Sequence, residues 1–299
     1  MSDPLVSVIC LSHNHKPFVQ EAINSVFNQS YQNIELIVVD DASSDGTQAE
    51  IAKSIAGKKV KFLALDKNLG NCRAFNLGFA QSTGDFIIDL AADDVLLPQR
   101  IEVGVADFLH YAEGSGVHFS DAFLIDAGGQ ITGTHYNRDA EGRINEHVPD
   151  GDVYKMLIKK YFICPPTMMV KRQVLKSLNG YDENLHYEDF DFWIRSSRNY
   201  KYIFNHAPLV KKRILKSGLG NEQTKWRNKH GETTLRVCNK ILELNRTPEE
   251  FQALRTRGFY EIRNAIRHFN FHLVPKYLKL ISESRKSQRR LSSPSSIDK

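Results

Sequence analysis

Cysteine is scarce in this 299-residue sequence, and the four cysteines are scattered along the chain. No C-x-x-C pair occurs, so the sequence suggests neither a zinc site nor a disulfide framework. No stretch approaches the roughly 20 apolar residues that a membrane-spanning helix needs. The first residues, MSDPLVSVICL, lack the basic region and the small-residue cleavage site of a signal peptide. Together these absences lead us to expect a cytoplasmic protein.

A glycine-rich phosphate-binding loop is also missing. After the first predicted strand, Val6 to Leu11, the chain continues with Ser12-His13-Asn14-His15. This turn contains no G-x-G-x-x-G that would let a pyrophosphate approach the backbone, which argues against a dinucleotide-binding protein. The formal net charge is only +5. Because no nucleic-acid-binding motif accompanies the two basic clusters, one at Lys211 to Lys216 and one at Arg285 to Arg290, we expect no nucleic-acid partner.

What the sequence does contain is an alternation of strand-like and helix-like runs through its first third. Strands are predicted at Val6 to Leu11, Ile34 to Val39, Val60 to Leu65 and Phe86 to Leu90, with helical patterns between and after them. Ala74 and Gly78 in the third helical pattern are small enough to let that helix pack closely on a sheet. This β-α-β-α order predicts an α/β fold with a doubly wound, mainly parallel sheet.

The stretch from Gly84 to Pro98 ends an apolar strand in two adjacent carboxylates, Asp93 and Asp94. In open α/β sheets, ligands bind at the carboxyl ends of the strands, where the loops diverge. Two neighbouring carboxylates favour Mg²⁺ or Mn²⁺, which usually also hold a substrate's phosphates. The alternative is that both acids cap the helix that begins near Pro98. The residues alone leave both interpretations open.

Acidic and aromatic residues interleave in the segment from Glu188 to Trp193. If this segment is helical, Asp189 lies on the same side as Phe192 and Trp193. An acid would then be held against an apolar wall that excludes water, an arrangement that can shift its pKa.

The composition changes near Gly218, after which several helix-like runs follow, including Thr233 to Leu244 and Pro248 to Leu280. We place a domain boundary near Leu219. The sequence predicts an α/β domain over residues 1–218, a helical extension over 219–291 and a disordered, serine-rich tail over 292–299.

In combination, these motifs resemble the inverting glycosyltransferases of family 2, which have the nucleotide-diphospho-sugar (GT-A) fold. The resemblance covers roughly residues 5 to 215, so the domain over 1–218 would be the catalytic one. The residues that carry it are Val6-Ser7-Val8-Ile9, Ser12-His13-Asn14, Val38-Val39-Asp40-Asp41-Ala42-Ser43, Asp45-Gly46-Thr47, Asn68-Leu69-Gly70, Ala74, Asn76, Gly78, Gly84-Asp85, Asp93-Asp94, Leu97-Pro98, Gly180-Tyr181-Asp182, Glu188-Asp189 and Arg195.

The resemblance implies a set of nucleotide-binding residues. Asp41 would accept the imide N–H of uracil, a contact that cytosine cannot make because its N3 carries no proton. Asp40 would support the same loop, and His13 would lie near the base where many relatives have an aromatic residue. Arg73 would reach the nucleotide or its phosphates, and Asp93 would lie near the ribose and the metal. For Asp41 and Arg73 the alternatives are a loop cap and a solvated helix residue.

The resemblance also implies a metal ligand and a catalytic base. Asp94 would bind Mn²⁺ or Mg²⁺ directly as an exposed ligand, and Asp189 would be the base, with its acidic neighbours as competing candidates. Many relatives have another Asp where this sequence has Ala91, and many have a His where it has Leu215-Lys216-Ser217. The basic stretch from Lys211 to Lys216 would either support the diphosphate or be a solvated strand edge.

These expectations describe an inverting transferase that moves a sugar, with a UDP-sugar favoured, to a carbohydrate or glycolipid acceptor in bacterial surface polysaccharide or glycolipid assembly. The alternatives are a non-catalytic sugar-nucleotide-binding subunit and a nucleotidyltransferase of similar fold.

A basic cluster near the C-terminus suggests peripheral contact with an anionic membrane. The cluster consists of Arg285, Lys286, Arg289 and Arg290. The competing expectation is that the C-terminal helices pack on the catalytic domain or on a homodimer partner.

Overall fold

The computed structural model describes residues 3–111, 113–215 and 230–292. The chain divides into two compact units. Unit 1 contains Met1–Gly151, Ile163–Asn184 and Asn199–Leu215, and unit 2 contains Asp152–Phe162, Leu185–Arg198 and Lys216–Lys299. The boundary predicted near Leu219 and residues 293–299 of the predicted tail lie outside the described residues.

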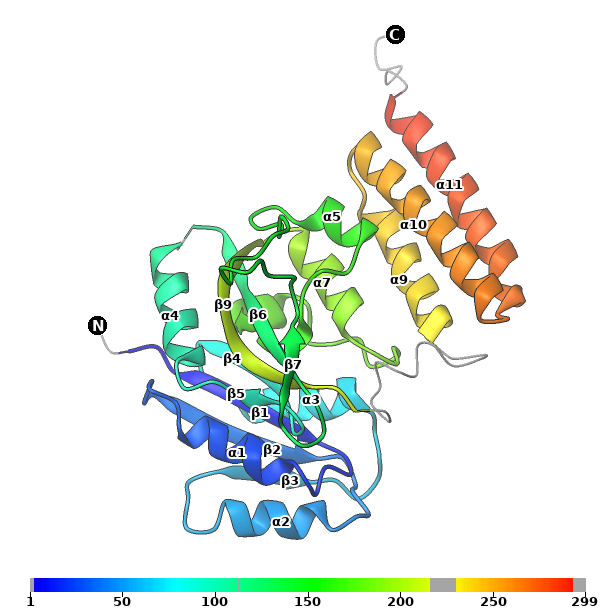
Figure 1. The fold of residues 1–299 in the computed structure, drawn as a ribbon. Helices are drawn as coiled ribbons and strands as arrows, with labels where there is room; N and C mark the ends of the chain where they lie inside the picture. The colour runs from blue at the N-terminus through cyan, green and yellow to red at the C-terminus, as the bar shows by residue number, and fades with distance from the viewer. Residues whose placement is uncertain (1–2, 112, 216–229, 293–299) are drawn as a thin grey trace. The chain divides into compact units, whose positions relative to one another are not determined.

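One half of the sheet in unit 1 is parallel. Its strands follow the order β3 (Lys61–Ala64), β2 (Ile34–Asp40), β1 (Val6–Ser12) and β4 (Phe86–Ala91) (Figure 1). Val6 pairs with Ile34 on one side and with Phe86 on the other, so the three central strands start in register. The strands predicted from the sequence are therefore confirmed, and their carboxyl ends lie at one edge.

The other half of the sheet is mixed. It continues from β4 through β8 (Met169–Lys171), β6 (Ser115–Ile125), β9 (Lys201–Arg213) and β5 (Val95–Leu96), with β7 (Ile131–Thr134) paired to β6. β8 is antiparallel to both of its neighbours, whereas β6 and β9 are parallel to each other. The strand β5 follows directly after Asp94 and pairs with β9, so the sheet itself fixes the position of the two acids.

Helices cover both faces of the parallel half. The helix α1 (Val19–Phe27) packs its buried side chains with Val8 and Val38 in one core cluster. On the opposite face, α3 (Asn71–Gln81) approaches so closely that a Cβ on Gly78 would lie 2.6 Å from Ile9 Cγ2. Unit 1 also contains α2 (Thr47–Ser54), α4 (Arg100–His110), the 3₁₀ turn η1 (Pro165–Thr167) and α6 (Arg172–Ser177). The predicted doubly wound arrangement is thus present.

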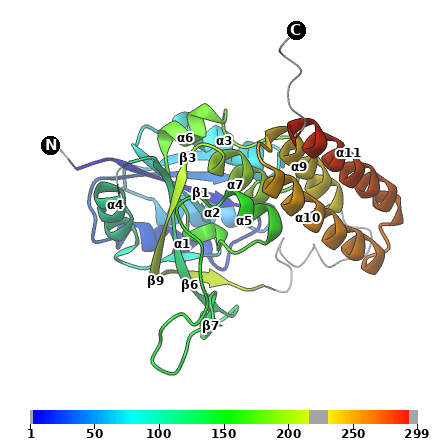
Figure 2. The ribbon, with the colours of Figure 1, turned by 90° about the horizontal axis from the view of Figure 1, so that it is seen from above.

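Unit 2 is helical. It contains α5 (Tyr154–Lys159), α7 (Asp189–Ser197), α9 (His230–Leu244), α10 (Pro248–Arg267), the 3₁₀ turn η2 (Phe271–Leu273) and α11 (Val274–Ser292). A capping box begins α10, in which Thr247 and Glu250 satisfy each other's backbone N–H groups. The helices α10 and α11 lie side by side (Figures 1 and 2), and Gly258 lets Ile281 pack against α10. No helix in the described ranges is long and apolar enough to cross a membrane.

A buried ionisable cluster joins α4 to the sheet in unit 1. His118 on β6 is fully buried, and its Nε2 lies 2.9 Å from Asp107 Oδ2. Asn205 Nδ2 donates to the same carboxylate oxygen at 2.8 Å. Burial lowers the pKa of His118 to about 4, and the nearby Arg100 acts in the same direction, whereas Asp107 opposes it. His118 is therefore neutral in the folded protein near neutral pH.

We expect this histidine to make the protein acid-sensitive. The unfolded state binds a proton near pH 6.5 and the folded state only near pH 4, so stability falls as the pH drops between these values. The shift corresponds to a loss of up to about 3 kcal/mol in the free energy of unfolding. Urea unfolding of the wild type and of His118→Gln, each near neutral pH and at about pH 5, measures it. The variant should lose less stability on acidification, and equal losses in the two proteins would contradict the assignment.

Candidate active site

The predicted site residues of unit 1 lie where neighbouring parallel strands end. Ser12 at the end of β1 pairs with Asp40 at the end of β2, and Asp41 N donates to Ser12 O at 2.8 Å. His13 follows Ser12, and its Nδ1 lies 2.7 Å from Asp41 O. The β1–β2 edge therefore brings His13 and Asp41 together, although 28 positions separate them in the sequence.

Asp41 is buried and fixes the loop that precedes α3. One carboxylate oxygen accepts from Leu69 N at 2.6 Å, and the other accepts from Gly70 N at 2.8 Å. Asn68 in the same loop has its Nδ2 3.2 Å from His13 Nε2. A carboxylate has about four lone-pair positions, so two acceptor positions of Asp41 remain beyond these two bonds.

Asp40 is fully buried, and its carboxylate holds the loop that follows β2. Its carboxylate accepts from Ser43 N at 2.9 Å, Ser43 Oγ at 2.5 Å and Gln48 Nε2 at 2.8 Å. Between the two acids and Ser43, Ala42 adopts a left-handed backbone conformation with φ of 58°. That conformation is unfavourable for a residue with a Cβ and persists only where surrounding contacts impose it. Asp40 supplies such contacts, and the loop after β2 is held in one shape.

Arg73 lies in the first turn of α3 and has a protein partner. Its Nε donates to Glu183 Oε2 at 2.9 Å, and both side chains are about half exposed. Asn76, one turn further along α3, donates to Glu183 Oε1 at 3.0 Å and to Tyr181 O at 2.9 Å. The surface ion pair is weak enough to be exchanged for a phosphate contact.

Asp93 and Asp94 occupy the turn between β4 and β5. Asp94 is only 5% exposed, and its Oδ1 accepts from Arg213 N at 2.8 Å. The expectation that Asp94 is an exposed ligand is therefore wrong, because β9 pairs with β5 and covers this carboxylate. Burial, and then repulsion from Asp93, raises the pKa of Asp94 to about 8. A cation bound between the two carboxylates would relieve both effects.

The donor set decides what kind of metal site these residues could form. Within the described residues, no three His, Cys, Asp or Glu side chains are grouped as a metal site. Two hard carboxylates suit Mg²⁺ or Mn²⁺, which commonly take their remaining ligands from water and substrate phosphates. Asp93 and Asp94 thus fit a metal that arrives with, and is shared by, a phosphorylated substrate.

Arg213 at the end of β9 organises this turn. Its side chain is only 2% exposed, so it is neither a solvated strand edge nor a free cation for a diphosphate. Nε donates to Asp93 O at 2.9 Å, and Nη2 pairs with Glu21 on α1 at 2.6 Å. Nη1 donates to the backbone oxygens of Asp126 and Ala127 at 3.0 and 3.2 Å. One guanidinium group therefore ties α1 and the β6–β7 turn to the backbone of the acidic pair.

Asp89 is a carboxylate at this edge that the sequence analysis did not select. It lies within β4, and its Oδ2 accepts from Tyr181 OH at 3.2 Å. Burial, and then the charges of Asp89 and Asp93, raise the pKa of the Cys10 thiol in β1 to about 12. The sequence signal that could have identified Asp89 was a single acid within the apolar run from Phe86 to Leu90.

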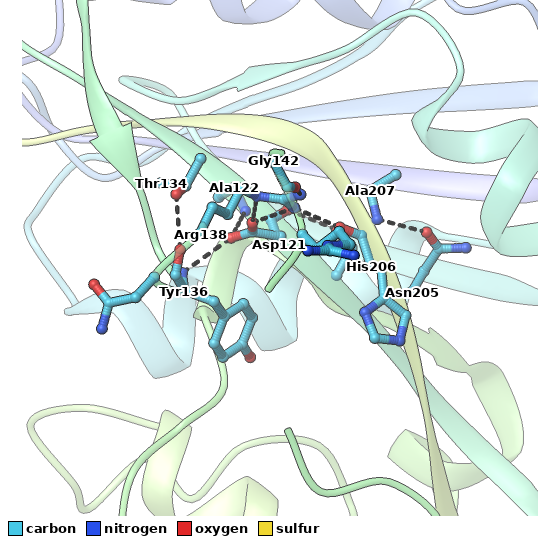
Figure 3. Close-up of polar contacts among 12 residues, drawn as sticks. Asp121, Ala122, Thr134, Tyr136, Arg138, Gly142, Asn205, His206 and Ala207 are labelled. Atoms are coloured by element: carbon cyan, nitrogen blue, oxygen red, sulfur yellow. Dashed lines mark hydrogen bonds and ion pairs between the residues drawn. The ribbon is translucent and has the colours of Figure 1, made fainter. Parts of the chain in front are cut away.

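A second feature missed by the sequence analysis is a buried ion pair that anchors the segment after β7 (Figure 3). Asp121 on β6 is fully buried, and its Oδ2 accepts from Arg138 Nη2 at 2.6 Å and Nε at 3.0 Å. Its Oδ1 accepts from the backbone N–H groups of Ala122 and Tyr136. Arg138 Nη2 also donates to His206 O at 2.6 Å. These contacts hold the segment against β6 and β9.

In unit 2, the predicted base Asp189 is the first residue of α7, a position at which the helix dipole favours negative charge. The segment is helical from Asp189 onward, which meets the condition set in the sequence analysis, and Phe192 and Trp193 are buried. Asp191 is 1% exposed, and its two carboxylate oxygens accept from Arg195 Nε and Lys240 Nζ, each at 2.6 Å. Asp191 is therefore committed to two ion pairs, whereas Asp189 is only partly buried.

Comparisons with known sequences agree with this arrangement. Residues 7–178 match the family model described as Glycosyl transferase family 2. An uncharacterized glycosyltransferase of Methanocaldococcus jannaschii is 33% identical over 224 residues, which cover 72% of this chain and 72% of that protein. An uncharacterized glycosyltransferase of Rickettsia typhi is 30% identical over 213 residues, which cover 71% of this chain and 64% of that protein.

Solved structures show the same fold at low sequence identity. TarS 1-349 of S. aureus, in complex with UDP-GlcNAc, has a TM-score of 0.66 at 16% identity, with 96% of this chain and 90% of that chain covered. The mannosyltransferase PcManGT from Pyrobaculum calidifontis, in complex with GDP-Man and Mn²⁺, has a TM-score of 0.60 at 16% identity, with coverage of 98% and 85%. The GT-A fold predicted from the sequence is thereby confirmed.

Proposed function

The chain belongs to glycosyl transferase family 2, and from this premise we propose that it transfers a sugar from a nucleoside diphosphate to an acceptor hydroxyl with inversion at the anomeric carbon. The observation that carries the proposal is the carboxyl edge of β2, β1 and β4. There the Asp41 loop follows β2 and the Asp93–Asp94 turn follows β4, the two parallel strands that flank β1. Base recognition and diphosphate recognition can therefore take place at one edge of a rigid sheet.

UDP is the favoured donor nucleotide. The backbone N–H groups of Leu69 and Gly70 use two acceptor positions of the Asp41 carboxylate. The two remaining positions suit the imide N–H of uracil. Cytosine offers no N–H at that ring position, so a CDP-sugar could not make this additional hydrogen bond to the carboxylate. TarS was solved with UDP-GlcNAc and PcManGT with GDP-Man, so the base has to be tested on this protein.

The role that we propose for the acidic pair is to bind a divalent metal ion. Asp93 and Asp94 would hold Mn²⁺ or Mg²⁺, the former being the ion in the PcManGT complex. When bound, the metal neutralises charge on the departing diphosphate. The side chain of Arg213 holds the backbone of the pair in place by donating to Asp93 O. The backbone N–H of Arg213 donates to the Asp94 carboxylate and holds that group in place.

Asp189 would act as the general base. Its carboxylate accepts the proton of the acceptor hydroxyl as that oxygen bonds to the anomeric carbon. The bond from the same carbon to the diphosphate oxygen breaks on the opposite face, and the nucleoside diphosphate leaves. Attack opposite to the leaving group inverts the configuration. The acceptor class that we propose is a carbohydrate or glycolipid of bacterial surface polysaccharide assembly.

We expect a panel of UDP-, GDP- and CDP-sugars with Mn²⁺ to give release of nucleoside diphosphate from a UDP-sugar at a rate at least about tenfold above that from a CDP-sugar. The physical reason is the N–H···carboxylate bond to Asp41, since a hydrogen bond to a charged group contributes about 1.5–3 kcal/mol. Coupled detection of released nucleoside diphosphate measures the rate. Release from no sugar nucleotide would contradict transferase activity.

The matched control for this panel is Asp41→Asn. Calorimetric titration with UDP should show weaker binding, whereas binding of CDP should change little, because only uracil uses the lost acceptor. Equal loss for both nucleotides would mean that Asp41 acts only on the Leu69–Gly70 loop. A preference for GDP would keep the transferase proposal and overturn the choice of base.

A further inference from the structure

The end of α10, the turn that follows it and the start of α11 display large apolar side chains to solvent. Ile266 is 51% exposed, Phe269 and Phe271 are each 56% exposed, and Leu278 is 52% exposed. The rings of Phe269 and Phe271 meet edge to face with centroids 5.9 Å apart. We call residues 262–282 the hairpin tip, because they join two helices that lie side by side (Figure 2). A cluster of exposed aromatic residues indicates an interaction surface.

The backbone at Phe269 is in an unfavourable conformation. Its φ is 59°, in the left-handed region that glycine or asparagine normally occupies after a helix. Asn270 N donates to Ala265 O at 2.7 Å, which closes the helix end in the usual way. A glycine or asparagine at position 269 would make this turn with less strain. Phenylalanine occupies this strained position although its ring is more than half exposed.

The charge of the hairpin tip has one sign. From Ile262 to Ser282 the sequence contains no Asp or Glu, whereas it contains four basic residues and two histidines. The basic residues are Arg263, Arg267, Lys276 and Lys279, and all four are exposed. The acids that face the tip come from outside it, with Glu283 at 3.8 Å from Lys279 and Glu232 at 3.4 Å from His272. The tip therefore combines exposed apolar rings with exposed cations.

We propose that the hairpin tip docks on an anionic lipid surface. The rings of Phe269 and Phe271 enter the interfacial region, and the four Lys and Arg side chains contact the lipid headgroups. Exposed rings accompanied by exposed cations favour a lipid surface over a protein groove, since a groove partner would also require complementary acids at fixed positions. Attraction by four cations gives reversible, salt-dependent binding. The surface differs from the cluster of Arg285 to Arg290, which lies towards the other end of α11.

Vesicle flotation of the full-length protein tests this proposal. Vesicles of phosphatidylcholine and phosphatidylglycerol in equal amounts should carry the protein at low salt, less at physiological salt, and pure phosphatidylcholine should carry little. The variant Phe269→Asn with Phe271→Ser should lose vesicle affinity by roughly tenfold or more. Asparagine suits the left-handed position, so the melting temperature should not fall. Loss of binding together with unchanged or increased stability is the supporting result.

The matched control is Leu291→Ser, which removes an apolar side chain of similar exposure, 54%, from the last turn of α11. It lies roughly 25 Å from the start of that helix at 1.5 Å per residue, and it should float like the wild type. Equal flotation of the double variant and the wild type would overturn the proposal, as would equal loss in Leu291→Ser. If no vesicle binds but the double variant abolishes self-association in size-exclusion chromatography, the tip is a contact between copies and the lipid proposal fails.

Discussion

Asp189→Asn should lower the turnover for sugar transfer by at least roughly 10²- to 10⁴-fold while leaving UDP affinity nearly unchanged. Asparagine keeps the shape of the side chain but cannot accept a proton. General-base catalysis of this size corresponds to about 3 to 5 kcal/mol of activation free energy. The nucleotide contacts that we propose are in unit 1, whereas Asp189 begins α7 in unit 2. Steady-state transfer assays and calorimetric titration with UDP measure the two quantities separately.

The neighbouring acids provide the controls for this experiment. Asp191 accepts from Arg195 and Lys240, so Asp191→Asn should lower the melting temperature, because each of these two partly buried cations loses an ion pair. Turnover of its folded fraction should remain within the wild-type range. Glu188→Gln at the N-cap of α7 is the competing candidate for the base. If Asp189→Asn retains near-normal transfer while Glu188→Gln loses it, the assignment to Asp189 is wrong.

The sequence predicted the parts of the fold that depend on local pattern. Short apolar runs that alternate with helical patterns identified β1 to β4. The acids after β2 and β4 marked the edge of the sheet. Gly78 was correctly expected to permit close packing, and a Cβ there would overlap Ile9. Each of these features can be recognised within a window of one helix or strand.

The contacts that hold the site together depend on long-range pairing and could not be predicted in the same way. Arg213 reaches Asp93 across 120 positions, and Asp121 meets Arg138 only because β7 folds back on β6. In the sequence both arginines are ordinary basic residues near acids. The burial of Asp94 likewise follows from the antiparallel pairing of β5 with β9, and a two-residue strand gives almost no sequence signal.

Asp94→Asn should abolish transfer, with a loss of at least about 10²-fold, because the metal contributes several kcal/mol of charge stabilisation in the transition state. Asparagine is a sharper choice than alanine, since its side-chain oxygen can still accept from the buried Arg213 N–H. Alanine would leave that donor unpaired and would lower stability for an unrelated reason. Transfer assays with Mn²⁺, and with EDTA for the wild type, measure the effect. Full wild-type activity in EDTA would contradict metal dependence.

Thermal unfolding separates the loss of a metal ligand from damage to the fold. The Asp94 carboxylate is destabilised by burial and by Asp93, so the neutral asparagine should leave the metal-free melting temperature unchanged or raise it. Mn²⁺ with UDP at roughly 100 times the dissociation constant should stabilise the wild type by about 2.7 kcal/mol, a shift of several degrees. Asp94→Asn should lose most of this shift, because Asp93 alone would hold the ion. If the variant is inactive but keeps the full Mn²⁺ shift, Asp94 acts on something other than the metal.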